Sequence, residues 1–133
     1  MIWFLLKCLE VIFIKIKVKG YLKNITDNEI IKFDEKGIKN NNKVTYSSDN
    51  IKYIIKINDN SIMLVREGNE FINTFVFDKN KSTCNYFLKD NNYDVDIDIK
   101  TNMINCDNDC IIIRYIIVDN NCEYEYKLEM SDI

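Results

Sequence analysis

The sequence lacks histidine, proline, alanine and glutamine altogether and has only three glycines, at positions 20, 37 and 68. Without histidine, the chain has neither the commonest general base, nor Ser–His and Cys–His nucleophile pairs, nor the imidazole ligands typical of catalytic zinc. The widely spaced glycines exclude a glycine-rich phosphate loop and with it nucleotide hydrolysis. We therefore favour a protein that is not an enzyme, and we expect no cofactor.

The missing alanine and glutamine also bear on the fold, because both residues favour helices. Isoleucine (23), asparagine (19) and lysine (16) dominate instead, and their A- and T-rich codons indicate an AT-rich bacterium. A chain of 133 residues provides one hydrophobic core and one domain. The formal charge of −3 gives no sign of a concentrated basic face, which argues against nucleic acid as a partner.

The five cysteines, at positions 8, 84, 106, 110 and 122, are odd in number and, apart from Cys106 and Cys110, lie far apart in the chain. Disulfide-stapled secreted domains have a denser pattern, so we predict reduced thiols and a cytoplasmic protein. The apolar run in residues 1–13 is broken by Lys7 and Glu10 and is shorter than the roughly 20 residues that span a bilayer. It also lacks the basic region and cleavage site of an export signal, so we expect no membrane association.

Residues 1–13 have a second interpretation. The segment Leu9-Glu10-Val11-Ile12 can be encoded by TTG GAG GTG ATT, which contains the purine-rich run that a bacterial ribosome pairs with upstream of a start codon. On this hypothesis translation starts at Ile14, and residues 1–13 are an N-terminal extension that reflects a misplaced start site. The domain is then residues 14–133.

Alternating polarity runs through most of the chain. Ile14, Ile16 and Val18 alternate with three lysines, which places the apolar side chains on one face of a strand and the charges on the other. The same alternation recurs over residues 94–100 and 122–130. Further strands are expected near residues 29–38, 43–48, 51–58, 61–67, 71–77, 83–89 and 109–118.

Short segments rich in asparagine and aspartate separate these strands, as at residues 40–42, 58–60, 78–80, 90–92 and 119–121. Asn and Asp tolerate left-handed backbone angles and bond to their own turn, so they can replace glycine in tight hairpins. Strands that recur every 8 to 12 residues with short connections form an antiparallel meander. The sequence therefore predicts an all-β protein with a single antiparallel up-and-down β-barrel.

Several segments resemble the YwiB-like family, a bacterial domain of unknown function. They are residues 54–68, which include Arg66 and Gly68, residues 75–81, the strand that holds Tyr86, and the strands at 14–20 and 111–118. The resemblance covers about residues 14–130 and implies a small barrel similar to lipocalins and other calycins. The family has no established activity. Where it usually carries a Thr-Pro-Tyr-Gly-like turn, this chain has residues 88–93, so the resemblance implies no role for that turn here.

The cluster Cys106-Asp107-Asn108-Asp109-Cys110 suggests a metal site, because two thiolates and two carboxylates fall within five residues. Cys84 or Cys122 would have to supply further ligands. The alternative is a polar hairpin between a strand that ends near Thr101 and one that starts near Ile111. We favour the hairpin, because one Cys-x3-Cys pair without a matching second pair is a weak signal.

The chain has two arginines, Arg66 and Arg114, against 16 lysines. Arg66 shares a strand face with Leu64, and Arg114 lies in a segment that is apolar on both faces. A guanidinium at a barrel mouth suits a carboxylate or phosphate, whereas a structural ion pair is the alternative that we favour for buried arginines. The aromatic residues either fill the interior or line a pocket. The expected ligand-binding residues are Arg66, Arg114, Tyr86, Tyr124 and Tyr126.

Three functions compete at this point. The first is a barrel that binds a small apolar, amphipathic or anionic ligand, and the second is an interaction or accessory protein with a filled barrel. The third, an enzyme that uses carboxylates or tyrosine, lacks any pair of acids that the sequence brings together. We favour the binding barrel narrowly over the interaction protein, as a monomer or a homodimer.

Overall fold

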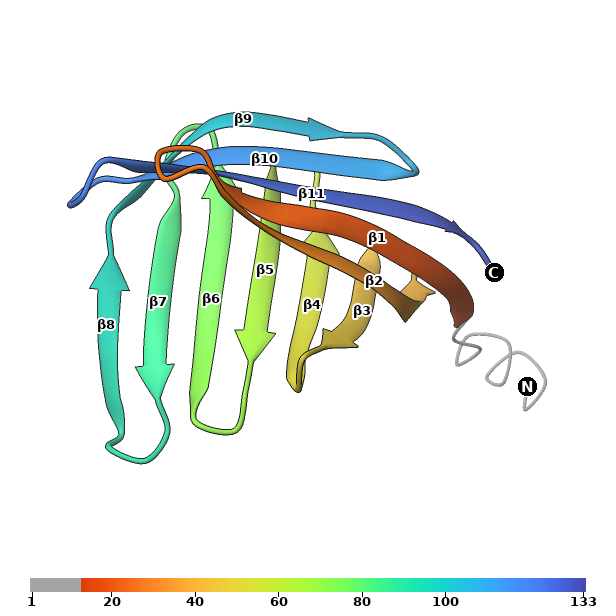
Figure 1. Cartoon of the computed structure of the whole chain (residues 1–133), viewed down its shortest axis with the longest axis horizontal. Coiled ribbons are helices and arrows are strands. Elements are labelled where there is room, and N and C mark those ends of the chain that lie inside the picture. Colours follow the sequence, from red (N-terminus) through yellow and green to blue (C-terminus); the bar gives the residue numbers. More distant parts are fainter. Residues whose placement is uncertain (1–12) are drawn as a thin grey trace, which may run out of the picture.

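The computed structural model describes residues 13–133, which form an all-β domain with antiparallel up-and-down topology (Figure 1). This confirms the predicted fold class. No described residue lies in a helix, so none of the described chain forms a helix that could cross a bilayer. The strands are β1 (Ile14–Asn24), β2 (Glu29–Asn40), β3 (Lys43–Ser48), β4 (Ile51–Ile57), β5 (Ser61–Glu67), β6 (Phe71–Asp78), β7 (Thr83–Leu88), β8 (Tyr93–Ile97), β9 (Ile99–Cys106), β10 (Cys110–Ile117) and β11 (Cys122–Asp132).

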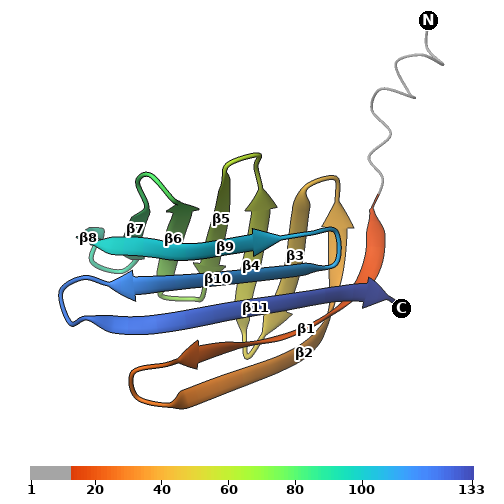
Figure 2. The same ribbon diagram turned by 90° about the horizontal axis from the view of Figure 1, so that it is seen from above.

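The strands form one sheet in the order β8-β7-β6-β5-β4-β3-β2-β1-β11-β10-β9, curled into a nearly closed barrel. Figures 1 and 2 show two layers whose strands cross each other. We call β3–β8 the wall and β9, β10, β11, β1 and β2 the roof. Only the barrel architecture is established here, and the calycin-like character that the family resemblance implies stays a prediction. The hypothesis about the translation start concerns a segment that lies almost entirely outside the described residues.

One corner between wall and roof lies at Asp98. The sequence predicts one strand over 94–100, because the alternation of Val95, Ile97 and Ile99 continues unbroken. In the structure this segment is divided: β8 pairs with β7 in the wall, and β9 pairs with β10 in the roof. The Asp98 carbonyl accepts a hydrogen bond from the Val118 amide at 2.9 Å. The predicted strand end near Thr101 is also wrong, because β9 continues to Cys106.

The opposite corner lies within β2. Residues 37–40 of β2 pair with β3 in the wall, whereas residues 29–36 are paired only with β1 within the described chain. The first part of β2 therefore leaves the wall, and β1 and β2 extend together as a projecting hairpin (Figure 2). This divergence leaves the barrel open on one side.

The predicted asparagine-rich turns at residues 40–42, 90–92 and 119–121 each contain a left-handed residue, whereas those at 58–60 and 78–80 contain none. Six described non-glycine residues have positive φ angles, and all are Asn or Asp. Such conformations strain most side chains but suit short polar ones that bond locally. They are Asn28, Asn41, Asp49, Asn50, Asn92 and Asn121.

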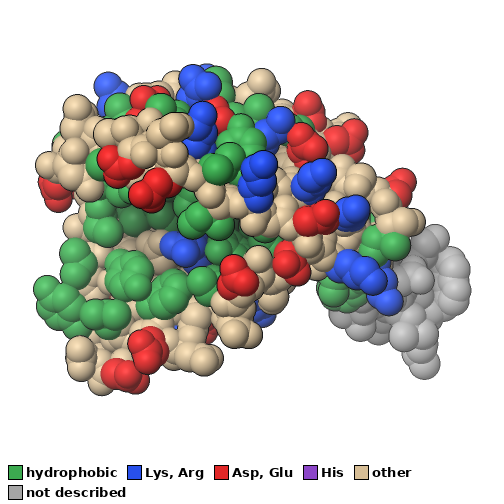
Figure 3. Space-filling model, viewed as in Figure 1, with side chains coloured by type: hydrophobic (Ala, Val, Ile, Leu, Met, Phe, Trp, Pro, Cys, Tyr) green, Lys and Arg blue, Asp and Glu red, His purple; other side chains and the backbone are tan. Residues whose placement is uncertain are grey.

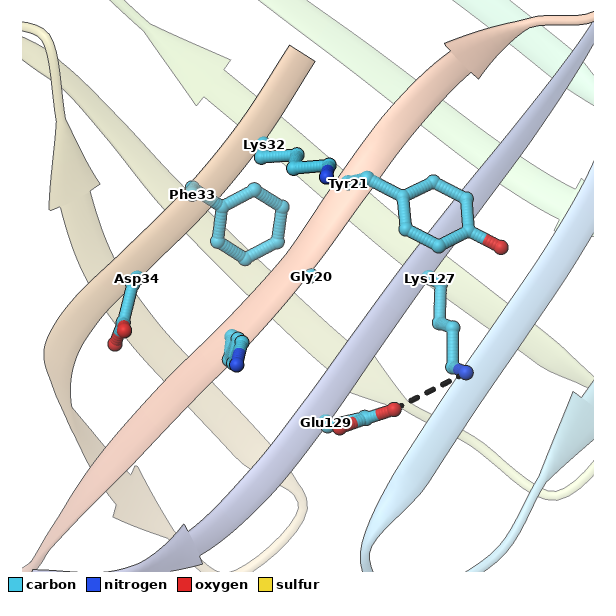
Figure 4. Close-up of a pocket in the computed structure, with 8 residues that line it drawn as sticks. Gly20, Tyr21, Lys32, Phe33, Asp34, Lys127 and Glu129 are labelled. Atoms are coloured by element: carbon cyan, nitrogen blue, oxygen red, sulfur yellow. Dashed lines mark ion pairs between the residues drawn. The ribbon is translucent and has the colours of Figure 1, made fainter. Parts of the chain in front are cut away.

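Gly20 has a different role, because it lies inside β1 and not in a turn. A Cβ atom at Gly20 would collide with the Lys127 carbonyl oxygen of β11 and lie 2.8 Å from Cζ of Phe33. Figure 4 shows the Phe33 ring extending from β2 toward Gly20. Glycine in a strand interior allows such close backbone approach and sheet bending, so Gly20 permits the roof to curl over Phe33.

The middle of the interior is filled by side chains from both layers. Seven of them are almost completely inaccessible, and fully burying a Val, Leu, Ile or Phe side chain stabilises a fold by roughly 1.5–3 kcal/mol. These are Phe77, Ile55, Ile111, Ile113, Leu128, Val18 and Val44. The filled centre restricts any ligand site inside the barrel to its open side.

Candidate ligand-binding site

A row of inward-facing residues crosses the wall from β3 to β7. The strand registers place Tyr46 opposite Tyr53, Tyr53 opposite Arg66, Arg66 opposite Asn73, and Asn73 opposite Tyr86. Directly opposed residues of antiparallel strands point to the same face. Arg66 therefore lies in the middle of the inner face of the wall, flanked by polar and aromatic neighbours.

Two aromatic rings flank the guanidinium of Arg66. Its Cζ atom lies 5.7 Å from the centroid of the Tyr53 ring and 5.8 Å from that of Phe71, distances at which cation–π attraction operates. Tyr53 in turn stacks on Tyr46 with centroids 4.7 Å apart, and Phe71 stacks on Tyr86 at 5.4 Å. Arg66 therefore lies between two stacked pairs of rings, Tyr46 with Tyr53 and Phe71 with Tyr86.

Asn73 is the polar partner of Arg66. Its Oδ1 accepts a hydrogen bond from Nη1 of Arg66 at 3.3 Å, and its Nδ2 donates to the Asn85 carbonyl at 3.1 Å. Asn73 is only 3% exposed, so these bonds fix its orientation. No carboxylate oxygen of residues 13–133 lies within 4.0 Å of the Arg66 guanidinium, so this partly buried charge has no ion-pair partner in that part of the chain.

The tyrosines of the core complete the surroundings of Arg66. The hydroxyl groups of Tyr46 and Tyr126 are 2.8 Å apart and buried. Burial raises the pKa of Tyr46, Tyr126 and Tyr115, and the positive charge of Arg66 partly opposes that rise at each of them. These phenols stay neutral, so among residues 13–133 the Arg66 charge meets polar and aromatic groups without a compensating anion.

The inner face becomes more exposed toward β8. Next to Tyr86, Val95 is 38% exposed, and Tyr93 at the end of the same strand is 57% exposed. Across the opening, Ile31 of β2 is 65% exposed and faces the interior beside Leu22. Figure 3 shows the molecule hollowed between the layers, with hydrophobic side chains gathered over β6–β8 and a basic side chain among them. We call this hollow the aromatic cleft.

Among solved structures, the crystal structure of the ywiB protein from Bacillus subtilis matches this chain with a TM-score of 0.67 at 17% sequence identity, over 96% of this chain and 98% of that chain. This chain has the YwiB fold. The match confirms, at the level of the fold, the resemblance drawn from residues 14–130. No family model and no curated protein matches the chain, so any ligand has to be inferred from the side chains.

The second arginine lies on the outer face of this YwiB fold. Arg114 of β10 donates from Nε to Oε1 of Glu125 at 2.6 Å, and Tyr21 donates to the other oxygen, Oε2, at 2.5 Å. Both hydrogen bonds stabilise the carboxylate across three neighbouring strands of the roof. Arg114 is therefore a partner in a structural ion pair and does not reach the aromatic cleft.

The three predicted tyrosines all face inward but occupy different depths. Tyr86 lies at the floor of the aromatic cleft, Tyr124 is half-buried under the roof and stacked on Tyr115 at 5.4 Å, and Tyr126 is buried in the centre. Arg66 and Tyr86 therefore lie on either side of Asn73 in the same part of the inner face, whereas Tyr126 is almost inaccessible to solvent.

Sequence reasoning missed Tyr53, Phe71 and Asn73 as neighbours of Arg66. Asn73 did carry a signal, because it is a polar residue on the apolar face of the strand that holds Phe71, Phe75 and Phe77. Tyr53 and Phe71 carried none, because only the register of the hairpins places them beside Arg66.

The cysteine cluster forms a hairpin at the end of β9 and β10. Asp107 Oδ1 accepts hydrogen bonds from the amides of Asp109 and Cys110 at 2.9 and 2.8 Å, so this carboxylate is used by the turn. Burial raises the pKa of Cys106 and of Cys110, which favours the thiol over the metal-binding thiolate. Within residues 13–133 no group of three or more potential metal ligands converges.

A groove of about 400 Å³ also lies on the outer face around Gly20. Figure 4 shows that lysines and acids alternate along it, and Lys127 is paired with Glu129 at 3.0 Å. Charges of both signs surround the groove, so no one class of ligand is favoured there. The aromatic cleft, whose cation has no carboxylate partner within residues 13–133, is the stronger candidate site.

Proposed function

We propose that this protein is a non-enzymatic binding module that takes a small amphipathic anion into the aromatic cleft. The acidic group of the ligand meets the guanidinium of Arg66, and its apolar part lies against the inner face of β6–β8. The observation that carries this proposal is the Arg66 side chain, which lies among aromatic rings without a carboxylate partner in the described chain.

The chemistry of the guanidinium favours a carboxylate or a phosphate. An arginine has five N–H donors in a planar fork, and within residues 13–133 the Arg66 side chain makes one hydrogen bond, to Asn73. Tyr53 and Phe71 lie near the guanidinium at cation–π distance, while its edge carries the remaining N–H groups. An edge-on approach is the geometry in which carboxylate and phosphate bind bidentately.

The apolar part of the ligand is inferred from the graded exposure of the cleft. Phe71 and Tyr86 form a stacked floor, and Val95 and Tyr93 continue it toward solvent. An acidic head group alone would leave these side chains in water. A ligand with a hydrocarbon or aromatic body covers them and gains roughly 25 cal/mol for each Å² of apolar surface buried.

Isothermal titration calorimetry with three probes of equal chain length tests the proposal. Dodecanoate should bind, dodecanol should bind more weakly, and dodecyltrimethylammonium should bind weakest, because only the first offers an anion to Arg66. Arg66→Gln should weaken dodecanoate binding about a hundredfold, the loss of one partly buried charged hydrogen-bonding partner. Arg114→Gln is the matched control and should bind dodecanoate like the wild type. Equal affinities for the three probes, or equal losses in the two arginine variants, would contradict the proposal.

A further inference from the structure

The first part of β2 is a strand edge that the fold leaves open. Residues 29–36 have β1 on one side and no strand on the other within the described chain. Ile30 and Ile31 on this segment are 48% and 65% exposed. An extended edge with exposed apolar side chains and no proline or bulge is a template for pairing with another strand. We propose that two copies of this chain pair through this edge, antiparallel and centred on Phe33, to form a symmetric dimer.

The charges on β2 favour Phe33 as the centre of the pairing between the two copies. With Phe33 opposite Phe33 of the second copy, Lys32 lies opposite Asp34 of the second copy, and the symmetry makes this contact twice. All four side chains are exposed on the outer face. Shifting the centre to Lys32 or to Asp34 places like charges opposite each other, which is destabilising in antiparallel pairs. The edge therefore complements itself in one register.

The other two open edges do not complement themselves in this way. On β8, a self-pair centred on Val95 places Asp94 opposite Asp96 of the second copy, and neighbouring centres place an aspartate opposite itself. On β9, the register with β10 shifts at Arg114/Tyr115, which marks a bulge in the edge region. Like charges and bulges are both means by which natural sheets prevent edge pairing. The edge of β2 has neither.

Pairing at β2 also has a consequence for the aromatic cleft. Side chains directly opposite each other in an antiparallel pair point to the same face, so the inner faces of both roofs lie on one side of the joined sheet. Phe33 and Ile31 of each copy face that side. The open sides of the two barrels then face a common space, where Ile31 of each copy lies opposite Glu35 of the other copy. Dimerisation does not depend on the proposed ligand, because the interface involves neither Arg66 nor a bound anion.

Sedimentation velocity of the full chain, across micromolar to millimolar concentration, tests the dimer. The wild type should show a dimer whose fraction rises with concentration. Lys32→Asp and Asp34→Lys should each weaken dimerisation about tenfold, because each turns two attractive contacts into two repulsive ones. An equimolar mixture of the two variants should dimerise like the wild type, since each mixed pair again joins opposite charges. Lys56→Asp, which makes the same charge change on the outer face of β4, should leave the dimer unchanged.

A wild type that remains monomeric throughout would overturn the proposal, as would a mixture that dimerises no better than its components. Asp34→Lys also loses the 3.9 Å contact with Lys17, so a thermal melt of each variant should first establish that it is folded. Dodecanoate titration of the single variants separates this inference from the proposed function. A monomeric variant that still binds dodecanoate supports both proposals, whereas a wild-type dimer that binds none of the probes contradicts the ligand proposal alone.

Discussion

The inner and outer faces of the sheet each hold one arginine and surround it differently. On the outer face, Arg114 has a carboxylate, Glu125, at 2.6 Å, and that carboxylate has a second donor in Tyr21. On the inner face, Arg66 has one amide, Asn73, at 3.3 Å, and two rings. The charge of Arg114 is therefore neutralised within the fold, whereas that of Arg66 has no carboxylate partner within residues 13–133.

The difference lies in the cross-strand neighbours and not in the arginines themselves. In the strand register, Arg114 is directly opposite Glu125, whereas Arg66 is directly opposite Tyr53 on one side and Asn73 on the other. A cross-strand pair of opposite charges is a common stabilising contact in sheets. An arginine placed among uncharged neighbours retains its attraction for an external anion, and this supports the ligand proposal.

The largest expected effect comes from making the inner arginine resemble the outer one. Asn73→Asp gives Arg66 an internal carboxylate at the position where Asn73 Oδ1 now accepts its hydrogen bond. The new ion pair should compete with the ligand and weaken dodecanoate binding about a hundredfold, comparable to losing a charged hydrogen-bonding partner. Calorimetry measures this loss while the arginine itself remains in place.

Asn105→Asp is the control for that change, because it adds the same charge on the exposed outer side of β9. It should leave dodecanoate binding unchanged. Binding that survives Asn73→Asp in a folded protein would mean that Arg66 does not contact the acidic group, and the two arginines would then be equivalent in function.

The sequence predicted part of this arrangement for definite physical reasons. Period-two alternation places Arg66 on the face of Leu64, and this held because β5 is a regular strand. The same alternation wrongly predicted one continuous strand through Asp98. Ile97 and Ile99 keep the period of two across the corner, so the sequence gives no sign that the pairing partner changes from β7 to β10. Arg114 was ambiguous, because Ile112, Ile113 and Ile116 make both faces of β10 apolar. Its pairing with Glu125 depends on register, which a single sequence does not encode locally.

A smaller effect, on stability, is expected from the uncharged Tyr46–Tyr126 pair of the inner face. Tyr46→Phe removes one of two buried hydroxyl groups that bond at 2.8 Å and leaves the Tyr126 hydroxyl without that partner. The free energy of unfolding should fall by about 1–2 kcal/mol, since an unsatisfied buried polar group is costly. The double change Tyr46→Phe with Tyr126→Phe should recover much of the loss in chemical denaturation. A double variant that loses the sum of both single effects would show that packing, and not the hydroxyl pair, holds this part of the interior.

The smallest effect concerns the outer arginine and depends on pH. The hydrogen bond from Tyr21 lowers the pKa of Glu125 below its ordinary 4.5, burial opposes this, and the bond from Arg114 lowers the pKa further. A carboxyl group with a lowered pKa in the folded state stabilises the fold above its unfolded pKa, and that contribution is lost as the pH falls through the folded value. Glu125→Gln should therefore be less stable than the wild type near neutral pH, by about 1 kcal/mol for a weakened hydrogen bond, and the gap should narrow as the pH falls below about 4.5. Urea denaturation of both proteins at a series of pH values measures the gap. A gap that stays constant down to acid pH would show that the charge of Glu125 does not contribute, and the outer arginine would then be no better neutralised than the inner one.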